Sequence, residues 1–317
     1  MGGASAHVTP PPPARAVAGG LAVVAATSVV AWALGAPQNS LGATAVRAVA
    51  DCAGAVVLGL SVMAFLDTGR HRAELVRSAA PALAVGAAVW LLAEVVRLLV
   101  VTAQAAALPV GGVGVGMFID FVVHTNPGRA GLVSAVAAAA VCATAVAAPP
   151  TAASAYVTGG IAAAGLTART LAGHLTESAL GGVSVAVHTL AAGLWCGTLA
   201  GLLLTVRHRG QWARVLPRFS TLALGCVALL AVLGVAGTFA RLDSPAQLWD
   251  TGYGRVLTAK LIVTAALLVL AWRNRTGWLP AARGHRATAG LSRTRSLAEL
   301  AIMAAALTLA AALAVTG

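Results

Sequence analysis

Charged residues are scarce in this chain: 9% of its 317 residues are Asp, Glu, Lys or Arg, whereas about a quarter of a soluble domain is charged. Hydrophobic residues make up 59% of the sequence, and no polar stretch is long enough to fold as a soluble domain of ordinary size. These features exclude a water-soluble fold. They predict a multi-pass protein of the cell (cytoplasmic) membrane, surrounded by lipid bilayer over most of its length.

Cysteine and methionine are scarce as well, with four residues of each type. All four cysteines fall in apolar runs without a C-x-x-C spacing, so the sequence indicates neither a disulfide framework nor a zinc knuckle. Four methionines are too few for a methionine-rich copper conduit. The sequence also lacks the aspartate motif of phosphorylated ion pumps, and its glycine-rich run 111–116 fits neither a dinucleotide nor a Walker pattern. We therefore expect neither an ATP-driven pump nor an enzyme.

Basic residues are the one charge type in excess, giving a net charge of +12. They stand in short segments between apolar runs, which is how orientation signals are placed in membrane proteins. A nucleic-acid-binding protein would instead gather them on one exposed face. No nucleic-acid partner is expected.

Apolar runs define the predicted architecture, because about 20 apolar residues are needed to cross a bilayer as a helix. The sequence predicts an all-α, polytopic transmembrane helix bundle of about nine spans. The stretch 104–128 is apolar but interrupted by glycines, so we expect a partly buried or re-entrant outer loop there, with a further helix as the alternative. The spans are expected near 16–34, 43–66, 79–101, 130–148, 152–170, 181–206, 219–241, 254–272 and 296–316.

The arginines predict an orientation. With the N-terminus inside, fourteen arginines fall in inner segments and five in outer segments, which favours N-in and C-out because basic residues mark cytoplasmic loops. Residues 1–15 are then a cytoplasmic N-terminal tail. The first apolar run could instead be a signal peptide, since Ala33 and Gly35 are small enough for a cleavage site, but its length of about 19 residues favours a retained helix.

Sidedness divides the seven histidines into two groups. Four lie in basic inner segments and are interpreted as solvated loop residues. His124, His174 and His188 fall on the outer side, on three successive segments whose short connections would make them neighbours. Imidazole ligates copper, zinc and haem iron, so these three are the candidate metal ligands. The alternative for each is an ordinary interfacial or hydrogen-bonded histidine.

Other polar side chains near these histidines are candidates for supporting roles. Trp195 lies seven residues after His188 and shares its helix face, with Cys196 beside it and deeper; Cys196 is a possible soft ligand but more typical of a packing residue. Met117 is a possible thioether ligand in the outer loop. Asp120 precedes His124 by four residues, so one helical turn would let its carboxylate orient the imidazole.

Two further sites place charge inside predicted spans. Glu94 and Arg97 are three residues apart and can pair on one helix face, which indicates a structural role more than a transport role. Lys260 lies inside the eighth span. It can extend its ammonium outward or pair with an outer carboxylate such as Asp51.

Five separated elements resemble a known family. They are the pair Gly173–His174, VHTLAAGLWCGTLAGLL over 187–203, RFS over 218–220, GVAGTFARL over 234–242, and TGYGRVLTAKL over 251–261. Together they look like the CopD copper-resistance membrane proteins, over residues 173–316. The leading helices, 16–172, resemble those of actinobacterial members in hydropathy and layout, which gives a two-part organisation with a CopD-like transmembrane domain at 173–317.

The resemblance implies copper handling at the cytoplasmic membrane, usually uptake of copper delivered by a periplasmic CopC-like protein. Matched position by position, the resemblance implies functional roles for His174, His188 and Trp195. Val185 and Cys196 depart from the family pattern. We expect a copper permease without ATP hydrolysis that binds copper at outer histidines. Two alternatives stay open: a b-type haem protein that moves electrons across the membrane, and an assembly factor that delivers copper to a respiratory oxidase. The oxidation state of copper, the direction of transport and the oligomer stay open as well.

Overall fold

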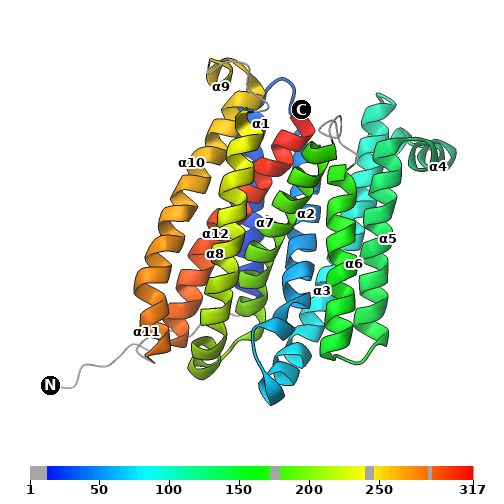
Figure 1. Ribbon diagram of the computed structural model, residues 1–317. Helices are drawn as coiled ribbons and strands as arrows, with labels where there is room; N and C mark the ends of the chain where they lie inside the picture. The colour runs from blue at the N-terminus through cyan, green and yellow to red at the C-terminus, as the bar shows by residue number, and fades with distance from the viewer. Residues whose placement is uncertain (1–12, 172–178, 240–245, 285–287, 317) are drawn as a thin grey trace.

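The computed structural model describes residues 13–171, 179–239, 246–284 and 288–316, and all secondary structure in these ranges is helical. Long helices run side by side along one axis (Figure 1). They are α1 (Pro13–Leu34), α2 (Leu41–Ser61), α3 (Gly69–Ala105), α5 (Asn126–Ala147), α6 (Ala152–Leu171), α7 (Ala179–Thr205), α8 (Arg209–Phe239), α10 (Gly252–Arg273) and α12 (Ala289–Thr316). Short elements join them: η1 (Met63–Phe65), η2 (Val110–Gly112), α4 (Val115–His124), α9 (Gln247–Asp250), η4 (Asn274–Trp278) and α11 (Leu279–Arg283).

The predicted all-α membrane bundle is confirmed. Among the described residues, eight of the long helices are long and apolar enough to cross a membrane. The remaining one, α6, was also predicted as a span; it is a 20-residue helix that packs beside α5 (Figure 1). Helices suit this environment because every backbone N–H and C=O is satisfied within the segment.

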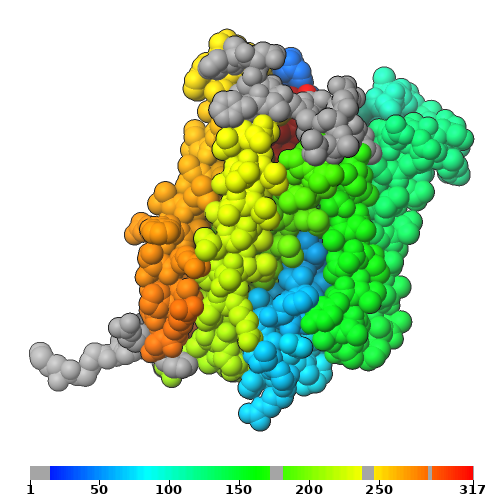
Figure 2. Space-filling model, in the orientation of Figure 1, coloured from blue at the N-terminus to red at the C-terminus, as the bar shows by residue number. Residues whose placement is uncertain are grey.

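The stretch 104–128 differs from the re-entrant loop that we expected. It contains the ten-residue helix α4, which projects from the side of the bundle at one end (Figures 1 and 2). Of the α4 residues, only Val122 is buried. The apolar composition therefore serves a surface helix against the ends of α3 and α5 and does not bring the chain into the bundle.

Helix α2 lies at the centre of the bundle and packs against α1, α3, α6, α7 and α12. Its closest approach is to α7, where Gly59 faces Gly197. A Cβ added at either glycine would overlap the backbone of the other helix. Small residues at a crossing let two membrane helices approach closely, so these glycines fix the distance between α2 and α7.

Side-chain contacts connect neighbouring segments at both ends of the bundle. We call them the α9 end and the α11 end, after the short helix at each. At the α11 end, arginines connect neighbouring segments: Arg214 Nε lies 3.2 Å from Asp67 Oδ2, and Arg293 Nη2 donates to the carbonyl of Leu203. At the α9 end, the side chains of Ser40, Thr125 and Thr251 accept backbone N–H groups and cap the starts of α2, α5 and α10. The arginine distribution predicts that the α11 end is cytoplasmic.

Candidate functional site

The predicted outer ligands are dispersed. His174 lies outside the described residues. His124 and Met117 lie on α4 and are exposed, and Asp120 Oδ1 is 2.9 Å from His124 Nδ1. Since α4 packs on α3 and α5, neither residue is placed at His188, which lies on α7. Within the described ranges, no three His, Cys, Asp or Glu side chains gather in a way that could hold a metal ion.

His188 lies on the α9 half of α7 and is partly buried. Its ring approaches α8, since a Cβ added at Gly234 would lie 3.9 Å from the His188 Cε1 atom. The ammonium of Lys260, on α10, is near enough to interact with the imidazole electrostatically. His188 is thus directed into the region between α7, α8 and α10.

A cluster of charged residues, partly to fully buried, lies in the N-terminal half of the chain, and we call it the arginine cluster. It joins α2, α3 and α6 through five residues: Arg47, Asp51, Glu94, Arg97 and Arg169. The pair predicted on α3 is present, with 2.8 Å between Arg97 Nε and Glu94 Oε2. Arg169 Nη2 lies 2.5 Å from Asp51 Oδ1 and 3.4 Å from Glu94 Oε1.

Asp51 forms its ion pairs within the arginine cluster. We expected Asp51 as a possible partner of Lys260, but its carboxylate pairs with Arg169 and with Arg47. Lys260 makes no ion pair within the described part of the chain. Trp90 Nε1 and Ser134 Oγ donate to Glu94 Oε1 at 3.2 and 2.9 Å. Three guanidinium groups therefore face two carboxylates, and the cluster is positively charged.

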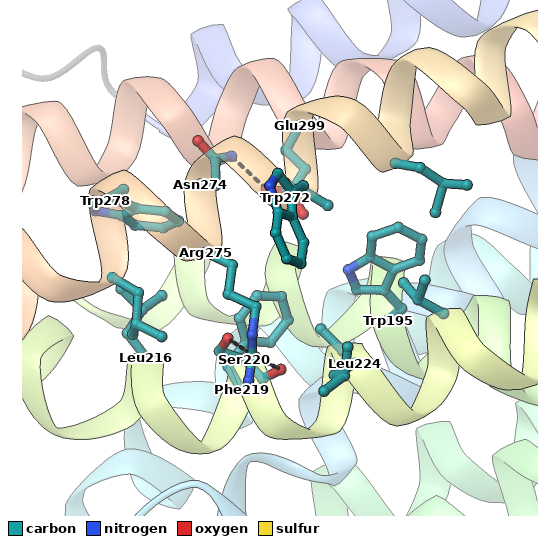
Figure 3. Close-up of a pocket in the computed structure, with 15 residues that line it drawn as sticks. Trp195, Leu216, Phe219, Ser220, Leu224, Trp272, Asn274, Arg275, Trp278 and Glu299 are labelled. Carbon is teal, nitrogen blue, oxygen red and sulfur yellow. Dashed lines mark hydrogen bonds between the residues drawn. The ribbon is translucent and has the colours of Figure 1, made fainter.

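A cavity of about 240 Å³ lies in the CopD-like half, between α7, α8, α12 and the segment from α10 to α11. Its walls are mostly apolar and include the indoles of Trp195, Trp272 and Trp278 (Figure 3). Trp272 is 67% exposed, so this side of the cavity opens toward the lipid. The cavity lies in the α11 half of the bundle, deeper than His188 along α7.

Glu299 of α12 lines this cavity, and its side chain is buried. Its Oε2 accepts a hydrogen bond from Asn274 Nδ2 at 2.7 Å (Figure 3). Glu299 makes no ion pair with any described residue. Sequence reasoning missed this residue, although the signal was present: a single carboxylate inside the last apolar span, which is expensive in a membrane and usually functional.

Asn274 and Arg275 stand on η4, a π-helical turn at the end of α10. Wide turns of this kind occur frequently at functional sites. Arg275 also lines the cavity, but its Nη1 donates to Ser220 Oγ and to the Ser220 carbonyl of α8, at 2.6 and 2.9 Å. The turn therefore directs Asn274 toward Glu299 and Arg275 toward α8.

Helices α7 and α12, which pack together, carry two buried hydroxyl groups that have no hydrogen-bond partner among the described residues: Thr198 Oγ1 and Ser296 Oγ. The buried indole N–H of Trp195 is near the Glu299 carboxylate. Thr198 is one turn from Trp195, and Ser296 is one turn from Glu299. Such atoms are rare in folded proteins, and each calls for an explanation. These hydroxyl groups lie at the same level along the bundle axis as Glu299.

The cysteines are separate from this cavity. All four are free, and Cys196, the residue after Trp195, is buried in the apolar core. Among the described residues, no cysteine lines the cavity, whose walls combine one carboxylate with indole rings.

Comparison with known proteins identifies two regions of the chain. Residues 36–185 match the family model described as "Copper resistance protein D-like, N-terminal domain", and residues 213–314 match "Copper resistance protein D". The first region holds the arginine cluster, and the second holds Asn274, Arg275 and Glu299. Searches of curated proteins and of solved structures gave no match.

Proposed function

Since this chain belongs to the copper resistance protein D family, we propose that it conducts copper ions across the cytoplasmic membrane without ATP hydrolysis. The route lies between α7, α8, α10 and α12. His188, with His174, receives the ion at the α9 end, and Glu299 binds it deeper in the membrane. His124 and Met117 on α4 form a separate capture point at the same end, where a soluble CopC-like copper carrier would deliver its ion.

The observation that carries this proposal is the buried Glu299 carboxylate without a basic partner. A charge in the membrane interior is costly unless it is paired. Among the described residues, the Glu299 carboxylate is contacted by the neutral Asn274 amide and the Trp195 indole N–H, and it makes no ion pair. A cation that reaches the cavity supplies the missing positive charge, so the site favours a passing metal ion.

The arrangement of polar groups supports a path with more than one step. His188 and Trp195 share a face of α7, and Trp195 lines the cavity of Glu299. Thr198 and Ser296 add unpartnered hydroxyl oxygens at that depth, and oxygen atoms can coordinate or hydrate a cation. In this proposal the ion binds first at the imidazole and then at the carboxylate.

The test is copper accumulation in cells that express Glu299→Gln or His188→Ala at equal membrane abundance. We expect each variant to lower copper uptake by about tenfold, the loss typical when a group that supports a metal site is removed. Glu74→Gln and His71→Ala are matched controls, because both residues lie in the first turns of α3, outside the route. Uptake at the unsubstituted level in both route variants would contradict the proposal.

Reconstitution distinguishes transport from copper delivery. Purified protein in liposomes should carry copper to the lumen without ATP or another protein. An assembly factor would bind copper without moving it across the bilayer. A haem protein would show a Soret absorption band, which we do not expect.

A further inference from the structure

We propose that the arginine cluster binds one small monovalent anion, chloride or another halide, between its guanidinium groups. The site lies in the N-terminal region of the chain, apart from the Glu299 cavity, and it would exist whether or not the protein conducts copper. Three features of the cluster support it: the balance of charge, the buried N–H donors without an acceptor, and the position near the α9 end of the bundle.

The arginine cluster holds one more positive charge than its carboxylates neutralise. Among the described residues, its ion pairs join three arginines to two carboxylates, those of Asp51 and Glu94, and no further acidic side chain pairs with these arginines. An arginine stays protonated under physiological conditions, so the excess charge persists. Because an uncompensated charge inside a membrane protein is unfavourable, a monovalent counterion would stabilise the cluster.

Buried guanidinium nitrogens of the cluster also lack acceptors. The side chains of Arg97 and Arg169 are only 8% and 7% exposed. Arg97 Nη2 and both Nε and Nη1 of Arg169 nevertheless make no hydrogen bond within the described part of the chain. Such atoms are rare in folded proteins, and a bound ion is one explanation for them. Guanidinium nitrogens only donate hydrogen bonds, so the missing partner is an acceptor, and the excess charge favours an anionic one.

The two buried guanidinium groups are neighbours, because both contact Glu94. Arg97 Nε lies 2.8 Å from Glu94 Oε2, and Arg169 Nη2 lies 3.4 Å from Glu94 Oε1. Like charges at such close quarters repel each other. An anion that contacts both groups offsets this repulsion with charge-assisted hydrogen bonds. Glu94 itself already accepts hydrogen bonds from Trp90 and Ser134, which leaves the remaining arginine donors to another acceptor.

Close packing around Arg97 favours a small ion. Helix α5 lies directly against its guanidinium group, since a Cβ added at Gly131 would lie 2.6 Å from Arg97 Nη2. This packing favours a single-atom anion over sulfate or phosphate, and the excess of one positive charge likewise favours a monovalent ion.

The position of the cluster gives an anion a way in from the α9 end. Arg47 stands in the second turn of α2, and Arg169 stands in the last turn of α6. The side chains of Arg47 and Asp51 are each 24% exposed, whereas those of Arg97 and Arg169 are buried. We therefore expect the ion to enter past Arg47 and to bind at the two buried arginines.

The test is binding of radiolabelled chloride to the purified full-length protein in detergent, by equilibrium dialysis in gluconate buffer of constant ionic strength. We expect a single saturable site, for which bromide competes and gluconate does not. The midpoint temperature of thermal unfolding should rise by about 3–5 °C when chloride replaces gluconate, because a ligand that binds only the folded protein stabilises it. Equal midpoints without saturable binding would overturn the inference and assign the unpartnered donors to water.

Two substitutions that change the charge of the cluster should act in opposite directions. Arg47→Gln leaves as many guanidinium groups as carboxylates, so chloride affinity should fall by about tenfold or more, the effect of one nearby charge in a partly buried site. Glu94→Gln frees Arg97 and Arg169 and increases the excess charge, so chloride should bind more tightly. Arg129→Gln, at an exposed arginine of α5, is the control and should leave the affinity unchanged.

Binding is compared in proteins that elute as a single peak in gel filtration. A purely structural cluster would not give opposite changes, so the same change in both variants, or none in either, would overturn the inference. If Arg47→Gln does not fold, Glu94→Gln and the bromide competition decide.

Chloride binding and copper transport can fail separately. Saturable chloride binding by a protein that carries no copper into liposomes would disprove the transport proposal alone. Copper uptake by a protein without saturable chloride binding would disprove the anion site alone.

Discussion

Two buried polar regions of this membrane protein use charge in opposite ways. The arginine cluster joins helices of the N-terminal region with three guanidinium groups and two carboxylates, and its ion pairs are formed within the protein. Glu299, in the second region, has a hydrogen bond to Asn274 and no ion pair among the described residues. The difference teaches that a buried charge with an oppositely charged partner in the protein has a structural role. A buried charge without such a partner is a candidate for binding a ligand of opposite charge.

Removal of Arg169 should have the largest effect on stability. Arg169→Ala leaves Asp51 and the Arg97-bound Glu94 with less positive charge, and breaking a buried pair in this way costs about 3–5 kcal/mol. The free energy of unfolding in detergent, measured by denaturant titration, should fall by that amount. Arg129→Ala, an exposed arginine on α5, is the control and should leave it unchanged. A loss below about 1 kcal/mol, the value of a surface pair, would show that the cluster is not a structural lock.

Replacing each of the two carboxylates by an amide should have different effects on the free energy of unfolding. Glu94→Gln removes a paired charge and should lower the free energy of unfolding by about 3 kcal/mol. Glu299→Gln keeps a side chain that can hydrogen-bond Asn274, so its unfolding free energy should change by less than about 1 kcal/mol, while copper uptake falls. Equal losses of stability in the two variants would remove the distinction between a structural and a ligand-binding carboxylate.

The α2–α7 crossing tests whether the two regions depend on one scaffold. Gly59→Ala places a methyl group against the backbone of Gly197, and overpacking of this kind costs about 1–3 kcal/mol. The midpoint temperature of thermal unfolding should fall, and copper uptake should decline with it. Gly160→Ala is the control, since nothing lies within 4 Å of its added Cβ. Selective loss of uptake, at unchanged stability, would show that the crossing acts on the route alone.

Features that depend on neighbours in sequence were accessible to prediction. The nine predicted spans correspond to long helices. A bilayer requires a minimum apolar length, and within it the backbone N–H and C=O groups must form hydrogen bonds inside the segment. The Glu94–Arg97 pair followed from a spacing of three residues, and the approach of Asp120 to His124 from a spacing of four. The loop 104–128 was predicted incorrectly as re-entrant, because composition does not distinguish a surface helix from a buried segment.

The sequence by itself determined that the chain is a helical membrane protein with copper-resistance motifs, since hydropathy and local spacing are properties of contiguous residues. Only the tertiary structure decided which charges are paired. Asp51 meets Arg169 across 118 residues of chain, and Glu299 meets Asn274 on a different helix. These contacts depend on how helices pack and rotate against one another, and that rotation arises from many close contacts, such as Gly59 on Gly197, that no local pattern encodes.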